Sequence, residues 1–339
     1  MSNQSSTIMS NLSGNSCEVK LLIELQTSIF LHGSEILMLI LSVIVFPLLF
    51  IMMEKCLRKS FFHVNIRIIS VVLCLSLLAH CVGRIVQHTT DIYFWIATIP
   101  ICDKRQYVQL CMVFRGMYLF GMYCSSFTSV TLVIERTIAT YLSQKYENRK
   151  AKIGVMIVAA QILLSTAITV IFLRSANLPD RPDYCFFRTP SNDWAVSLDV
   201  LSLSLNAIAL FQGFRLNNIN IKLRSTVIVS HLSQKYQIEE NKTLIRVILR
   251  FICIDFFFMV CYFLLTFISD FNQKSLSFSS TLAYFELIHC VPVYAIVMMI
   301  AMPKTIKKIQ QENTQKLGDH VRVNDDAYLP YLKKQWLTR

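Results

Sequence analysis

The sequence predicts an all-α membrane protein, a bundle of seven transmembrane helices with the N-terminus outside and the C-terminus in the cytoplasm. Three observations predict it. Hydrophobic residues make up 54% of the 339 residues and charged residues only 16%, whereas a soluble domain usually carries about 25%. The apolar residues form blocks of about 20, the length that crosses a bilayer core. The basic residues gather on alternate connections between these blocks.

Seven apolar blocks of spanning length follow one another along the chain. They cover Glu35–Met53, Val64–Ile85, Tyr107–Ile134, Ile153–Leu173, Trp194–Phe214, Thr243–Ile268 and Thr281–Met302. Lipid offers no hydrogen-bond partners, and the blocks are too long for barrel strands, so we expect helices. The chain then divides into an extracellular segment (1–34), a membrane domain (35–302) and a cytoplasmic tail (303–339).

The basic residues also orient the helices. Most of the 33 lysines and arginines lie in the connections after the first, third and fifth spans and in the tail after Pro303. The positive-inside rule places these segments in the cytoplasm and, with seven spans, the N-terminus outside. The net charge of +12 is therefore explained by topology, and we expect no nucleic-acid partner.

The N-terminal segment is polar, so we expect no cleavable signal peptide and an uncleaved first span. Asn3 and Asn11 begin glycosylation triplets in this outer segment. Asn241 begins a third triplet, which the topology leaves unused on the cytoplasmic side.

Several polar side chains fall at membrane depth, where they are costly and indicate function. Together with neighbouring tyrosines, they predict a small-molecule cavity in the outer half of the bundle. The candidates are Arg84, Arg115, Tyr118, Asp199, Asp255, Tyr262, Glu286 and His289, with Tyr123 as further lining. A purely structural alternative pairs Arg115 with Asp199 or Glu286, while Arg84 extends to the outer surface.

No pattern in the sequence indicates an enzyme. The seven histidines have no metal-ligand spacing with cysteines or acids, and no nucleophile elbow or phosphate loop is present. We therefore expect neither a catalytic residue nor a metal or other cofactor.

An acid and an arginine, Glu135 and Arg136, end the third span. This arrangement resembles the cytoplasmic switch of rhodopsin-like receptors, in which the acid holds the arginine at rest. Ordinary interface charges that close a helix are the alternative. The resemblance also implies a disulfide from Cys111, at the outer end of the same span, to Cys185 in the second outer loop. Cys102 is a rival partner for Cys185, and Cys17–Cys102 is a possible second disulfide.

Two prolines give further expectations near the C-terminus. Pro292 and Tyr294 resemble the proline–tyrosine switch of the same receptors, although Val291 replaces the usual asparagine. Pro303 suits a helix start. We expect a short helix from Pro303 to Gln310 on the inner membrane surface, with its lysines near anionic lipid headgroups.

Four stretches resemble the nematode serpentine chemoreceptors of the Sra superfamily, most closely the Sre class, with the Srb and Srab classes as alternatives. They are Phe62-His63-Val64-Asn65, Arg84, the segment from Ile134 through Tyr141 to Tyr146-Glu147, and Leu232–Asn241. The resemblance implies a seven-helix bundle of GPCR type in the plasma membrane of sensory neuron cilia. It implies binding of a small environmental chemical, signalling to a heterotrimeric G protein, contact with membrane lipid and a possible receptor oligomer.

Carried over by position, the resemblance assigns the switch to Glu135 and Arg136. The loops facing the G protein would contribute Tyr141, Tyr146, Leu232, Tyr236, Glu240 and Asn241. Two features depart from rhodopsin-like receptors: the second span lacks a mid-membrane aspartate, and the sixth span lacks a proline. A ligand-gated ion channel and a small-molecule transporter are the alternative functions; the charge distribution disfavours the first, and the lack of an internal repeat disfavours the second.

Overall fold

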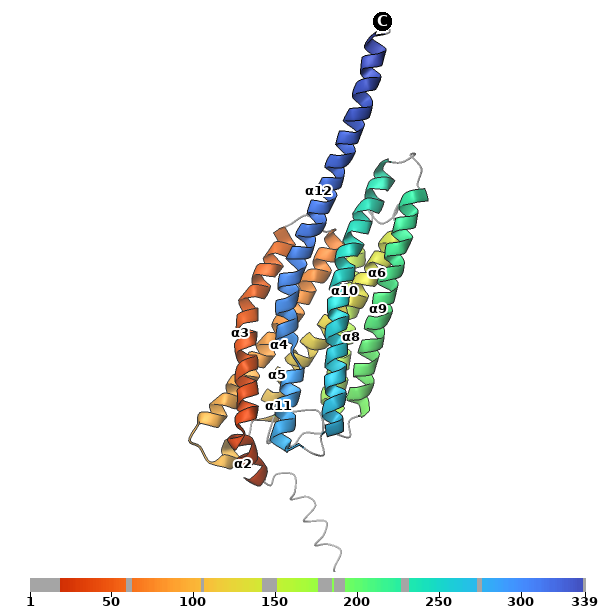
Figure 1. Cartoon of the computed structure of the whole chain (residues 1–339). Helices are drawn as coiled ribbons and strands as arrows, with labels where there is room; N and C mark the ends of the chain where they lie inside the picture. Colours follow the sequence, from red (N-terminus) through yellow and green to blue (C-terminus); the bar gives the residue numbers. More distant parts are fainter. Residues whose placement is uncertain are drawn as a thin grey trace, which may run out of the picture.

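A computed structural model describes residues 19–58, 63–104, 107–141, 151–175, 185, 193–226, 232–272 and 276–337. The elements within these residues are helices. They are α2 (Val19–Thr27), α3 (Ile29–Arg58), α4 (Val64–Ile96), the 3-10 helix η1 (Ile101–Lys104), α5 (Val108–Ser126), α6 (Thr128–Tyr141), α8 (Lys152–Ser175), α9 (Asp193–Thr226), α10 (Leu232–Asn272), α11 (Phe278–Ile288) and α12 (Val291–Leu337). The long helices run side by side as one bundle (Figure 1).

Seven spans in the described part of the chain are long and apolar enough to cross a membrane, which confirms the predicted fold class. The third span contains α5 and α6, and the seventh contains α11 and the first part of α12. Helix α2 and the C-terminal end of α12 lie at opposite ends of the bundle (Figure 1), as an odd number of spans requires. Which end faces the cytoplasm stays a prediction from the basic residues.

The N-terminal end of the bundle differs from the expectation. Helix α3 begins at Ile29 rather than near Glu35, and α2 precedes it. Leu25 and Leu31 pack with Leu282 of α11 in a buried apolar cluster. Helix α2 carries leucines at helical spacing between Lys20, Glu24 and Gln26, so it buries one apolar face.

The C-terminal helix also differs. No separate helix begins at Pro303, because α12 runs without a break from Val291 to Leu337. Beyond the proline, Ile309 is buried and Glu312 forms an ion pair with Arg246 of α10, at 3.7 Å. These contacts hold the helix against the bundle after a single backbone hydrogen bond is lost at the proline. The last part of α12 then projects beyond the other helices (Figure 1).

Candidate ligand cavity and cytoplasmic switch

A cavity lies between α5, α9, α10 and the junction of α11 with α12. Its empty volume is about 600 Å³, including its opening to solvent. Aromatic rings, thioethers, three serines and two carboxyl groups line it. The lining residues are Met122, Tyr123, Ser125, Ser126, Asp199, Ser202, Asp255, Phe258, Met259, Tyr262, Ile288, His289, Cys290, Val291 and Tyr294. A concave, largely apolar site with a few convergent polar groups is the usual form of a small-molecule site.

The seventh span is interrupted where it borders the cavity. Pro292 has no amide hydrogen, and its ring would clash with the carbonyl of Ile288 in a continuous helix. His289 instead adopts φ −73° and ψ 56°, and the Cys290 amide donates to the Ile288 carbonyl at 2.7 Å. This is an inverse γ-turn with His289 at its centre. Irregular backbone at membrane depth is tolerated where it borders a cavity or is buried in protein.

The third span is interrupted by a turn at Phe127, between α5 and α6. Side chains from other helices donate hydrogen bonds to the backbone carbonyl groups around this turn. Gln161 of α8 donates to the Cys124 carbonyl at 2.7 Å, and Asn206 of α9 donates to the Ser126 carbonyl at 3.4 Å. Thr128 also donates its hydroxyl to Cys124. Such side-chain bonds compete with the helix ladder and favour a local break.

The cavity has a polar group at each end. At one end the Tyr262 hydroxyl lies 3.4 Å from a carboxyl oxygen of Asp199 and 3.4 Å from Nε2 of His289. At the other end Ser129 donates a hydrogen bond to Asp255, and the Tyr294 hydroxyl faces the same carboxyl group. The second set joins α6, α10 and α12, so the cavity ends on three helices that continue toward the other end of the bundle.

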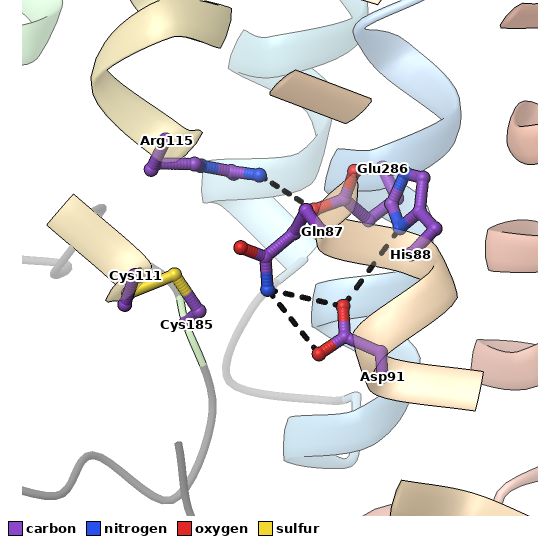
Figure 2. The surroundings of a disulfide bond; sticks show 7 residues. All are labelled: Gln87, His88, Asp91, Cys111, Arg115, Cys185 and Glu286. Atoms are coloured by element: carbon purple, nitrogen blue, oxygen red, sulfur yellow. Dashed lines mark hydrogen bonds and ion pairs between the residues drawn. A yellow bond between two sulfur atoms is a disulfide. The ribbon is translucent and has the colours of Figure 1, made fainter. Parts of the chain in front are cut away.

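A buried cluster of charged groups lies beside the cavity, between α4, α5 and α11. Glu286 accepts from Arg84 at 3.0 Å and from Arg115 at 3.1 Å, and His88 lies 3.6 Å from it. Figure 2 shows Arg115 extending from α5 toward Glu286. Both guanidinium groups lie over the ring of Tyr118, at 5.1 and 4.5 Å from its centre. Arg84 is 1% exposed, so it does not extend to the outer surface.

A disulfide joins Cys111 of α5 to Cys185, a bond that Figure 2 places near Arg115. This is the pair that the resemblance to rhodopsin-like receptors implied. Cys102 also belongs to a disulfide, and its partner lies outside the described residues, as does Cys17. The bond ties Cys185 to the first turn of α5.

At the other end of the third span, Arg136 connects three helices. Its guanidinium group lies 2.5 and 2.6 Å from the carboxyl oxygens of Glu135 and donates to the Asn241 side chain of α10 at 3.0 Å. Asn241 in turn donates to Thr140 at 2.9 Å and to Asn220 of α9 at 3.0 Å. Glu135 and Arg136 are 0% and 3% exposed. The acid and the arginine are therefore part of a buried network, not ordinary surface charges.

His63 lies close to this network and begins the second span. Its ring Nδ1 accepts a hydrogen bond from the backbone amide of Asn65 at 3.3 Å and so caps the N-terminus of α4. Burial, and next the positive charge of Arg136, lower the pKa of His63. The ring is therefore neutral at pH 7, the form that can accept this hydrogen bond.

The candidate residues from the sequence fall into three groups. Asp199, Asp255, Tyr262 and His289 line the cavity, whereas Arg84, Arg115, Tyr118 and Glu286 form the charged cluster beside it. Tyr141 is exposed at the end of α6 and Glu240 is exposed within α10, whereas Asn241 of α10 is a half-buried partner of Arg136 rather than a loop residue. Asn3, Asn11 and Tyr146 lie outside the described residues, as do the side chains of Leu232 and Tyr236.

Sequence reasoning missed several residues that the structure brings to these sites. Ser129 and Asn220 are polar residues inside spans and could have been found as such. The cavity also contains Met122, Phe258 and Met259. Apolar side chains of this kind carry no signal in the sequence, because they match the lipid-facing residues of every span.

Comparison with known proteins agrees with this arrangement. The family described as "serpentine type 7TM GPCR receptor class ab chemoreceptor" matches residues 16–337. Three Caenorhabditis elegans proteins are similar to the chain. Serpentine receptor class beta-6 is 26% identical over 281 residues, which is 80% of this chain and 81% of the relative. Class beta-11 is 26% identical over 58% of this chain and 57% of the relative, and class alpha-10 is 24% identical over 66% and 68%.

The seven apolar spans define a multi-pass membrane protein. The chain belongs to the class ab serpentine chemoreceptor family. The superfamily inferred from the sequence is thus correct, but the Sre class is not supported: the matching family is class ab, and the relatives are of the beta and alpha classes.

Proposed function

We propose that the chain is a G-protein-coupled chemosensory receptor of the plasma membrane, placed in sensory neuron cilia. A small environmental chemical binds in the cavity between the third, fifth, sixth and seventh spans, and the cytoplasmic face signals to a heterotrimeric G protein. One observation carries the proposal: α10 borders the cavity with Asp255 and holds Arg136 with Asn241. Membership of a chemoreceptor family supports the same class.

Helix α10 can act as a lever between the two sites. It is continuous from Leu232 to Asn272 and contains no proline. Asp255 and Asn241 are 14 residues apart, or about 21 Å along the helix axis. A ligand that favours a tilted α10 therefore draws Asn241 away from Arg136 and frees the arginine for the G protein. The ligand stabilises this conformation only by binding it more tightly than the resting one.

The proposal is tested in cells that express the chain with a heterotrimeric G protein. G-protein dissociation is followed by energy transfer while volatile and water-soluble chemicals are applied. A ligand-dependent signal is expected, and Arg136→Ala should abolish it at equal surface expression, because the buried arginine is the group released. The matched control is Arg58→Ala, whose exposed side chain forms an ion pair with Glu54. An ionic current without a G-protein response, unaffected by Arg136→Ala, would favour the channel instead.

A second prediction concerns the receptor without ligand. Asn241→Ala removes the hydrogen bond to Arg136 and those to Thr140 and Asn220. A hydrogen bond to a charged group contributes about 1.5–3 kcal/mol, so basal G-protein activation should rise at least roughly ten-fold. Asn218→Ala, at an exposed asparagine of α9, should leave basal activity unchanged. Equal basal activity in both variants would show that Asn241 does not restrain Arg136.

A further inference from the structure

One end of the cavity holds a carboxyl group, Asp255, with no Lys or Arg beside it among the described residues that line the cavity. Asp255 is 4% exposed, accepts from Ser129 and faces the Tyr294 hydroxyl. The two nearby arginines, Arg84 and Arg115, both bind Glu286. A carboxylate at membrane depth is costly, and such residues mark ligand or ion sites.

The aromatic residues that line the cavity next to Asp255 also favour the binding of a cation. Phe258 and Tyr294 meet edge to face with ring centres 5.4 Å apart, and both line the cavity. Tyr262, two turns along α10 from Asp255, and Tyr123 of α5 add further ring surface. Aromatic faces attract ammonium groups through their quadrupoles, and carboxylate and aromatic walls together recognise organic cations. Asp199 at the other end of the cavity adds negative charge that draws cations inward.

We infer that the ligand of this cavity is a small organic ammonium ion whose charged nitrogen binds the Asp255 carboxylate between aromatic walls. The inference rests on the proposed receptor function, since it names the ligand class of the same cavity. The ammonium supplies the positive charge that the lining residues lack, and the Ser129 and Tyr294 hydroxyls hold the carboxylate in place. The apolar part of the ligand fills the space beside Met122 and Met259.

The test uses the full-length receptor purified into lipid nanodiscs. Its thermal unfolding temperature is measured with 2-phenylethylamine, its N,N,N-trimethyl analogue and 2-phenylethanol, and with matched aliphatic amines and alcohols. The amines and the trimethyl compound should raise the unfolding temperature, and the alcohols should not. Removal of one partner from a buried charge pair weakens affinity about 30-fold to several thousand-fold, so Asp255→Asn should weaken amine binding roughly 30-fold or more. Asp255→Glu keeps the charge and should keep measurable binding.

Glu54→Gln is the matched control, because this carboxyl group is half exposed and far from the cavity in sequence and contacts; it should bind amines as the wild type does. The inference is overturned if no amine stabilises the control receptor, or if Asp255→Asn binds amines with unchanged affinity. Neutral alcohols that stabilise the receptor and dissociate the G protein, while amines do neither, would overturn it yet leave the proposed function standing. The opposite outcome is also distinguishable: the wild-type receptor binds amines and Asp255→Asn does not, but amines cause no G-protein dissociation in the wild type. That result would support the ammonium site and contradict the proposed signalling function.

Discussion

Replacement of Glu286 by glutamine should destabilise the receptor more than any other single carboxyl-to-amide change in the described helices. Glu286 is 1% exposed and forms ion pairs with Arg84 and Arg115, which are 1% and 5% exposed. The glutamine keeps the shape of the side chain but removes the negative charge that both buried guanidinium groups contact. Breaking a buried ion pair in this way costs about 3–5 kcal/mol. The measurement is the thermal midpoint of the purified receptor, together with the fraction that reaches the cell surface.

Two further variants separate the loss of charge balance from the loss of a single contact. Glu54→Gln breaks an exposed pair with Arg58, which should cost about 0–1 kcal/mol. A triple variant with Glu286→Gln, Arg84→Met and Arg115→Met removes all three charges and should recover much of the lost stability, because apolar replacement of a buried ionic set is often neutral. A Glu286→Gln midpoint equal to that of Glu54→Gln would contradict the assigned role.

The charged cluster of Arg84, Arg115 and Glu286 could be predicted from the sequence only in part. Composition and block length predicted seven spans, and the rarity of charge at membrane depth marked Arg84, Arg115 and Glu286 as a set. Which of these charged residues form ion pairs with one another was harder to predict from the sequence, because Arg84 and Glu286 are 202 residues apart in the chain. The sequence left Asp199 and Glu286 as equal partners for Arg115. Only the way in which α4, α5 and α11 meet decides between them.

The helix interruptions were only partly predictable. Pro292 marked the seventh span for a kink, because the missing amide and the ring clash act on any helix. Phe127 gave no such sign, since the turn there depends on Gln161 and Asn206 from two other helices. Conversely, Pro303 predicted a helix start that the structure does not have. A proline signal is decisive only when tertiary contacts do not restore the helix around it.

The crossing of α4 and α5 provides the other prediction with a large effect. Gly121 of α5 faces the backbone of α4, and a Cβ atom at this position would lie 2.7 Å from both the Cβ and the backbone nitrogen of His80 and closer still to the Ser76 carbonyl. Real Cβ contacts are not that short, and backbone cannot rotate away as a side chain can. Small residues that allow close backbone approach are the usual means of helix association in membranes.

Gly121→Val should therefore force α4 and α5 apart. The separation would also move His80, whose ring Nδ1 donates a hydrogen bond to the Tyr118 carbonyl and whose ring packs on the Tyr118 ring. Because Tyr118 supports Arg84 and Arg115, the crossing and the charged cluster should fail together, and little receptor should reach the cell surface. Gly33→Val is the matched control, since a Cβ atom there meets nothing within 4 Å. Surface expression and thermal midpoint of the two valine variants give the comparison; equal values would mean that α4 and α5 do not pack as closely as described.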